Sequence, residues 1–124
     1  MDSYERYMSM INGQKVDCVP RIPILMHFAA KYINTSYEKF ARDHKVMFQA
    51  NKALVLDFDF DQLDIMSDPW RETTAFGGQI KYLENTIPEC VRHPLSETKD
   101  LALLDKPDLA LAFASQTVLK TRHL

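Results

Sequence analysis

The 124 residues, 46% of them hydrophobic and 26% charged, suffice for one domain with a buried core and exclude a low-complexity or linker-like chain. A formal net charge of −2, with no basic face or tail, argues against a protein that binds nucleic acid or an anionic membrane. No apolar run reaches bilayer-spanning length, no secretory signal stands out, and Cys18 and Cys90 lack a CxxC partner, so we expect a cytoplasmic protein with reduced thiols.

The first predicted element is an amphipathic helix over residues 3–12. Its apolar residues recur at helical spacing, Ser3 suits the N-cap, and Gly13 suits the position just after the last turn. Pro20 and Pro23 then bar a helix. The short apolar run IPILM predicts a buried strand at residues 22–26.

Two helices are predicted over residues 36–56. A T-x-x-E capping box that begins at Thr35 opens the first, and Asp43 can cap the second, which carries a clear apolar stripe. A second strand is predicted at residues 62–67.

After this strand, a glycine pair opens an extended excursion or hairpin over residues 77–95, and helices follow over residues 97–122. Strands that alternate with helices are typical of an α/β fold with a parallel sheet. Two parallel strands do not complete such a sheet, however, because it is normally covered on both faces by several βαβ units. Residues 1–124 therefore read as the N-terminal segment of an incomplete α/β domain.

Five aspartates crowd the stretch from Leu56 to Asp68. A calcium loop is disfavoured, because Gln62 stands where an EF-hand requires glycine and Asp68 where it requires a bidentate glutamate. Alternation of apolar and acidic residues explains the first three aspartates as a solvated face. Asp68 differs, since it follows a predicted strand, and ligands bind at the carboxyl ends of strands in parallel sheets and barrels. We predict that Asp68 is a catalytic carboxylate.

His27 and Lys31 follow the first predicted strand. If the chain turns helically there, their side chains share a face and line the same mouth as Asp68, which makes them candidate substrate-binding residues. The alternative is a histidine anchored by adjacent backbone and a solvated lysine. No H-x-C, H-E-x-x-H or C-x-x-C spacing supports a metal site, and no phosphate-binding glycine loop is present. No metal or cofactor is expected in this chain.

Three segments carry a family resemblance: GQKVDCVPRIPILMHFAAKY, DQLDIMSDPWRETTAFGGQIKY and VRHPLSETKDLALLDKPD. In order and spacing they resemble the N-terminal portion of the uroporphyrinogen decarboxylase superfamily, which includes corrinoid-dependent enzymes such as methylcobalamin:coenzyme M methyltransferase. The resemblance implies a TIM (β/α)8 barrel whose first two strands are residues 22–26 and 62–67. Such barrels run to about 250 residues or more, so this chain would hold only the opening third of one.

The resemblance also assigns roles to the candidate residues. Decarboxylases carry M-R-Q-A-G-R-Y after the first strand, and its two arginines bind substrate carboxylates; here the stretch is MHFAAKY, with His27 and Lys31 in their places. The decarboxylase F-S-D-I is matched by M-S-D-P, so the aspartate that contacts pyrrole N–H groups falls on Asp68.

Two functions remain open for a complete enzyme: tetrapyrrole decarboxylation and corrinoid-dependent methyl transfer. The replaced arginines favour methyl transfer, because a lysine ammonium does not reproduce a bidentate guanidinium fork. Zinc and a corrinoid would then belong to the complete methyltransferase-type enzyme, with zinc ligands from a later H-x-C…C set. The alternative is that the isolated chain is a truncated, non-catalytic fragment or assembly module, which self-associates or needs a partner chain to complete the barrel.

Overall fold

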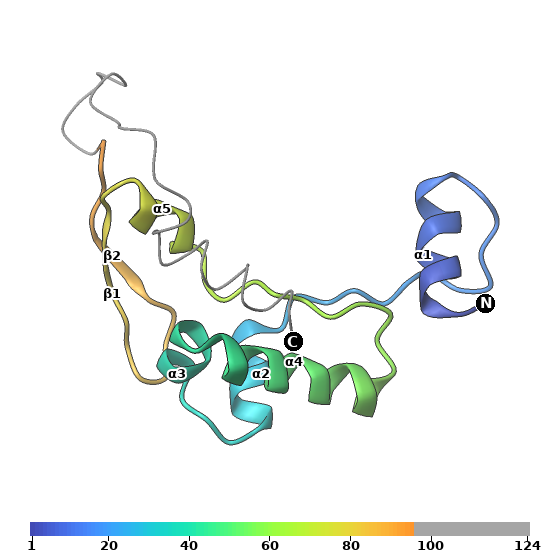
Figure 1. The fold of residues 1–124 in the computed structure, drawn as a ribbon, viewed down its shortest axis with the longest axis horizontal. Helices are drawn as coiled ribbons and strands as arrows, with labels where there is room; N and C mark the ends of the chain where they lie inside the picture. Colours follow the sequence, from blue (N-terminus) through green and yellow to red (C-terminus); the bar gives the residue numbers. More distant parts are fainter. Residues whose placement is uncertain (96–124) are drawn as a thin grey trace.

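The computed structural model describes residues 1–95. In chain order the elements are α1 (Ser3–Ile11), α2 (Met26–Tyr32), α3 (Tyr37–Arg42), α4 (His44–Phe58), α5 (Arg71–Ala75), β1 (Gln79–Lys81) and β2 (Glu89–Arg92). Figure 1 shows α2, α3 and α4 grouped together, with α5 and the β1–β2 pair at one end and α1 at the other. The helices predicted over residues 97–122 lie outside the described residues. None of the helices within residues 1–95 has the length and apolar character needed to cross a membrane.

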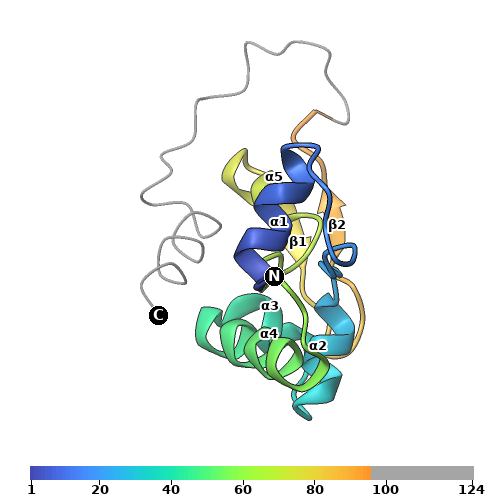
Figure 2. The same cartoon turned by 90° about the vertical axis from the view of Figure 1, so that its right-hand side faces the viewer.

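The core lies between α2, α3 and α4, which also lie together in the turned view of Figure 2. Two alanines on α2 let that helix approach its neighbours closely, and larger side chains from α3 and α4 fill the remaining space. The buried cluster consists of Ala29, Ala30, Tyr37, Phe40, Met47, Ala50 and Leu54. The predicted apolar stripe of the second helix therefore faces the core, as an amphipathic helix requires.

Local capping fixes where the helices of the core begin. Asp43 caps α4 as predicted, because its Oδ1 accepts hydrogen bonds from the backbone N–H groups of Lys45 and Val46. The cap of α3 is Ser36, whose hydroxyl accepts from the next turn, and not the predicted Thr35. The backbone N–H of Thr35 is instead used in closing the end of α2, so α3 begins one residue later.

Helix α1 is formed as predicted but is capped by Asp2 instead of Ser3. The Asp2 carboxylate accepts from the Glu5 N–H at 2.8 Å, and the Glu5 side chain accepts from the Asp2 N–H at 3.1 Å, which makes a reciprocal capping box. Gly13 follows the last turn with φ +67°, as predicted for a helix terminator. No residue of α1 is buried, so this helix is not part of the core.

The structure has no strand at residues 22–26 or 62–67, in contrast to the prediction. Met26 is instead the first residue of α2, and the chain before it and the segment 62–67 run in the same direction in Figure 1, from the side of α1 toward α2 and α5. One backbone hydrogen bond joins their starts, from the Asp61 N–H to the Arg21 carbonyl oxygen at 2.9 Å. Pro23 has no N–H to donate, and two neighbouring segments alone make a marginal sheet, which explains why no regular ladder forms.

The excursion predicted from the glycine pair is a β-hairpin. β1 and β2 are antiparallel, with Ile80 opposite Cys90 and a register irregularity at the start of β1. A Cβ atom on Gly78 would lie 2.6 Å from Thr73 Cγ2 and 2.8 Å from the Thr73 carbonyl oxygen, so only glycine allows the hairpin to approach α5 this closely. The described part of the chain thus combines packed helices with one antiparallel two-stranded sheet, and within residues 1–95 the predicted parallel sheet is not formed.

Candidate functional site

His27 and Lys31 lie one turn apart on α2 and line the same cavity, as their spacing predicts. The cavity has a volume of about 290 Å³, and its other lining residues are neutral: Asn34, Thr35 and Asn85. The His27 ring also meets the edge of the Tyr37 ring, with centroids 5.4 Å apart. The arrangement brings one permanent cation, one imidazole and several amide and hydroxyl groups to one surface hollow.

Asp68 lies in the interior, with a side chain that is 0% exposed. Its Oδ2 accepts from the Ser67 hydroxyl at 2.9 Å, and its Oδ1 accepts from the Trp70 N–H at 2.9 Å. The guanidinium of Arg71 forms an ion pair with Oδ2 at 3.5 Å. Both carboxylate oxygens are therefore held in fixed positions by the chain itself.

Arg71 is the partner that the sequence did not reveal. It is 4% exposed, and it donates hydrogen bonds to the Ser67 hydroxyl and to the carbonyl oxygen of Ala41. These contacts tie the start of α5 to the end of α3. An arginine three residues after an aspartate at a helix start is a usable signal for such a pair, since residues at i and i+3 are neighbours on a helix.

Tyr37 separates Asp68 from the cavity of His27. The Tyr37 hydroxyl donates to the Ser67 carbonyl oxygen at 2.7 Å, and its ring contacts the His27 ring in a T-shaped arrangement. Burial, and then the negative charge of Asp68, raise the pKa of Tyr37 to about 12. The structure thus brings His27 and Lys31 together, but it connects Asp68 to them only through this ring and does not include it in their cavity.

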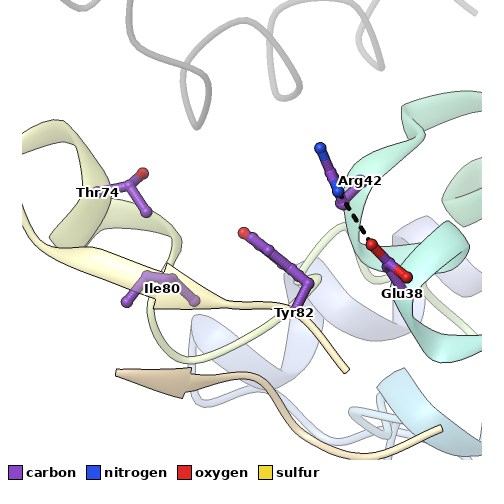
Figure 3. Close-up of a pocket in the computed structure, with 5 residues that line it drawn as sticks. All are labelled: Glu38, Arg42, Thr74, Ile80 and Tyr82. Atoms are coloured by element: carbon purple, nitrogen blue, oxygen red, sulfur yellow. Dashed lines mark hydrogen bonds and ion pairs between the residues drawn. The ribbon is translucent and has the colours of Figure 1, made fainter. Parts of the chain in front are cut away.

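A second cavity, of about 360 Å³, lies between α3, α5 and the hairpin (Figure 3). Glu38 and Arg42 form an ion pair at 2.9 Å on its α3 side, and the Arg42 guanidinium lies 5.6 Å from the centre of the Tyr82 ring. Thr74 and Ile80 line the other side. Sequence analysis missed this site because its residues come from three separate elements and share no motif.

Tyr82 connects this second cavity with the buried ion pair. Burial, followed by the charge of Asp68, raises the pKa of Tyr82, so its hydroxyl lies within electrostatic reach of that carboxylate. The hydroxyl is buried and has no hydrogen-bond partner among the described residues. The charge of Asp68 therefore acts on both Tyr37 and Tyr82, although Asp68 lines neither cavity.

The remaining aspartates of the acidic stretch have separate partners. Asp57 accepts from the Tyr32 hydroxyl at 2.7 Å, Asp59 pairs with Arg21 at 2.7 Å, and Asp61 pairs with Arg6. Within residues 1–95 no three His, Cys, Asp or Glu side chains gather closely enough to hold a metal ion.

Comparison with known proteins identifies the family. The family model described as uroporphyrinogen decarboxylase matches residues 2–123, nearly the whole chain. No curated protein and no solved structure matches the chain. The family match agrees with the resemblance of the three segments that contain His27, Lys31 and Asp68. The chain belongs to the uroporphyrinogen decarboxylase family.

Proposed function

We propose that this chain forms the opening sector of a TIM-barrel enzyme, and that the complete enzyme transfers a methyl group between a corrinoid and a thiol. The observation that carries the proposal is the cavity on α2, where His27 and Lys31 stand in place of the two arginines of the decarboxylases. Membership of the family supports the barrel, and the length of 124 residues corresponds to about half of a typical one or less.

The chemistry of this cavity favours a corrinoid over a porphyrinogen rich in carboxylates. An arginine binds a carboxylate through two parallel hydrogen bonds, whereas Lys31 offers a compact ammonium group and His27 an imidazole, and neither has the forked geometry of a guanidinium. The amide side chains of Asn34 and Asn85 match the amide groups at the edge of a corrin ring, because an amide both donates and accepts hydrogen bonds.

Asp68 is the carboxylate that we assign to the reaction centre of the complete enzyme. Its fixed orientation supports this role, since Ser67 and the Trp70 N–H hold one oxygen each and Arg71 forms an ion pair with Oδ2. The zinc of the methyltransferase branch would activate a thiol, and its ligands would come from outside residues 1–95. We further propose that the enzyme acts in the cytoplasm.

The experiment is an assay of the full-length protein that contains this chain, with methylcobalamin plus a thiol and, separately, with uroporphyrinogen. We expect demethylation of methylcobalamin, followed by its absorbance change, and no decarboxylated product. His27→Ala and Lys31→Ala should each raise KM for the corrinoid, because both remove a contact from the cavity wall. Lys45→Ala, which removes an exposed lysine of α4 outside this cavity, should leave KM unchanged.

Release of carbon dioxide from uroporphyrinogen, without turnover of methylcobalamin, would overturn the methyl-transfer proposal in favour of decarboxylation. If both cavity variants turn over the corrinoid with an unaltered KM, His27 and Lys31 are not part of the substrate site.

A second proposal concerns the 124-residue chain by itself: we propose that it is non-catalytic and acts as an assembly unit. Its support is the exposure of apolar side chains on the two segments, where Ile24 and Met66 are 58% and 45% exposed. Apolar side chains at this level of exposure favour association with a second surface.

A further inference from the structure

The hairpin carries a thiol and an imidazole in direct contact, apart from both cavities. The Sγ atom of Cys90 on β2 lies 3.4 Å from Nδ1 of His93, within hydrogen-bond range for sulfur. Sγ also lies 3.5 Å from the carbonyl oxygen of Arg92. Of these two acceptors, only the imidazole can remove the thiol proton, because a backbone carbonyl does not act as a base near neutral pH.

The imidazole is held by a segment outside its own hairpin. The ring of His93 contacts the ring of Trp70 edge to face, with centroids 5.5 Å apart and planes at 71°. Trp70 directly precedes α5, so this contact restricts the orientation of the imidazole relative to Cys90. A thiol and a base held together in this way are the two parts of an activated sulfur nucleophile.

The thiol is also within reach of small molecules. Cys90 is a free cysteine of intermediate exposure, and β2 lies at the edge of a two-stranded sheet. Cys18 is free as well and is more exposed, but among the described residues its thiol has no hydrogen bond to a histidine ring. Cys18 therefore serves as an internal control for Cys90, because its thiol is more accessible but has no imidazole beside it among the described residues.

We propose that Cys90 is a modification site that forms a mixed disulfide with small-molecule disulfides of the glutathione type, with His93 as the base. Nδ1 of His93 takes the thiol proton, and the thiolate attacks one sulfur of glutathione disulfide. The bond between Sγ and that sulfur forms as the original S–S bond breaks, and the departing glutathione thiolate takes the proton from the imidazolium. One disulfide is consumed and one is formed, so no further oxidant is needed.

The position of Cys90 connects this modification with the site. Cys90 lies opposite Ile80 in the hairpin, and residues directly opposite each other in an antiparallel pair share a face of the sheet. Ile80 lines the cavity between α3, α5 and β1 (Figure 3). A glutathionyl group on Cys90 would stand beside that wall of the cavity.

The test compares the two thiols in the same protein. The 124-residue chain is treated with limiting iodoacetamide near neutral pH, and the alkylated fractions of Cys90 and Cys18 are followed by peptide mass spectrometry. We expect Cys90 to react faster than Cys18, by about tenfold, although it is less exposed. His93→Gln should abolish most of that difference by slowing Cys90 alone, whereas His44→Gln, a matched change on α4, should alter neither rate.

A second measurement uses glutathione disulfide itself. In the unaltered chain we expect the mass of the glutathionyl group to appear on the Cys90 peptide before it appears on the Cys18 peptide. In His93→Gln we expect it to appear on the Cys90 peptide later than in the unaltered chain. Equal alkylation of the two thiols in the unaltered chain would overturn the proposal, and so would glutathionylation that begins at Cys18. If Cys90 reacts faster than Cys18 and its rate is the same in His93→Gln, with circular dichroism unchanged, the role of the imidazole is refuted. None of these outcomes depends on the corrinoid or on turnover.

Discussion

At the scale of single residues, the buried ion pair of Asp68 and Arg71 gives the first prediction. Both side chains are at most 4% exposed, so Asp68→Asn would remove a buried negative charge that lies 3.5 Å from the guanidinium of Arg71. Removal of one partner from such a pair costs about 3–5 kcal/mol in the free energy of unfolding. We expect this loss in urea denaturation, whereas Asp57→Asn, which alters an exposed carboxylate, should change the midpoint little.

Because Asp68→Asn also destabilises the folded chain, a test of the proposed catalytic role of Asp68 has to separate turnover from unfolding. Asp68→Asn should lower turnover of the complete enzyme far more than Asp57→Asn does, but part of that loss could come from unfolding. Turnover is therefore measured where circular dichroism shows the variant to be folded. Equal turnover in the two variants under that condition would contradict a special role for Asp68.

Tyr37 gives a prediction about alkaline pH. Its pKa is raised to about 12 by burial and then by the charge of Asp68, while an unfolded tyrosine titrates near 10. Below about pH 10 both states keep the proton, and between about 10 and 12 only the folded state keeps it. The folded state therefore loses stability as the pH rises through this window, by up to about 2 kcal/mol.

The matched variant is Tyr37→Phe, which has no phenol at this position. At pH 8 it should be less stable than the unaltered chain by about 1 kcal/mol, because the hydrogen bond to the Ser67 carbonyl oxygen is lost. Above pH 10 this deficit should shrink and then reverse, as the unaltered chain alone loses the Tyr37 contribution. The raised pKa of Tyr82 is present in both proteins. A deficit that stays constant from pH 8 to pH 11.5 would refute the assignment.

At the scale of elements, the features set by neighbouring residues were predictable from the sequence. Helical periodicity and short-range caps placed α1, α3 and α4, with errors of one residue at two caps. The glycine pair at Gly77 predicted the hairpin, because a left-handed turn and a close backbone approach both require glycine there. The shared face of His27 and Lys31 followed from a spacing of four residues.

The features that depend on distant partners were not predictable. Residues 22–26 and 62–67 have the composition of strands, yet a strand exists only if its backbone groups find a regular neighbour. The ion pair of Asp68 with Arg71, and the cavity lined by Arg42, arise only after α3, α5 and the hairpin have packed. A single sequence carries no direct signal for such contacts between separate elements.

The attachment of α1 gives a prediction at this scale. α1 buries no residue, and its Arg6 side chain bonds to Asp17 at 2.7 Å and also pairs with Asp61, whose side chain is 1% exposed. Arg6→Gln should therefore raise the hydrogen-exchange rates of the amides in α1 while those in α4 stay protected. Arg21→Gln is the matched control, since it removes an ion pair with Asp59, whose side chain is 92% exposed.

Acid should release α1 by the same contacts. The pKa of Asp61 is lowered, first by the hydrogen bond from the Arg21 N–H and further by Arg6. Its contribution to stability is therefore fully present above the unfolded value of about 3.9 and is lost as the pH falls through the folded value. Exchange in α1 that is the same in Arg6→Gln and in the unaltered chain would show that other contacts hold the helix.

At the scale of the whole molecule, the two extended segments present one covered face and one bare face. Successive side chains of an extended segment point to opposite faces. Leu25 and Ile65 pack against the core formed by α2, α3 and α4, whereas their neighbours Ile24 and Met66 are exposed. This is the arrangement of parallel segments with helices on one face, and it accords with a sector of a barrel in the family to which the chain belongs.

The bare face gives the last prediction. Since Ile24 and Met66 are 58% and 45% exposed, the 124-residue chain at micromolar concentration should bind the dye ANS and elute from gel filtration as a species larger than a monomer. Replacing both residues with Ile24→Thr and Met66→Gln should lower dye fluorescence and association together. Val91→Thr removes a side chain that is 60% exposed on β2, away from this face, and should change neither. An isolated sector of a barrel can cover these side chains only by association. A monomer that unfolds cooperatively and does not raise ANS fluorescence would therefore contradict this prediction and show that the chain folds as a complete unit.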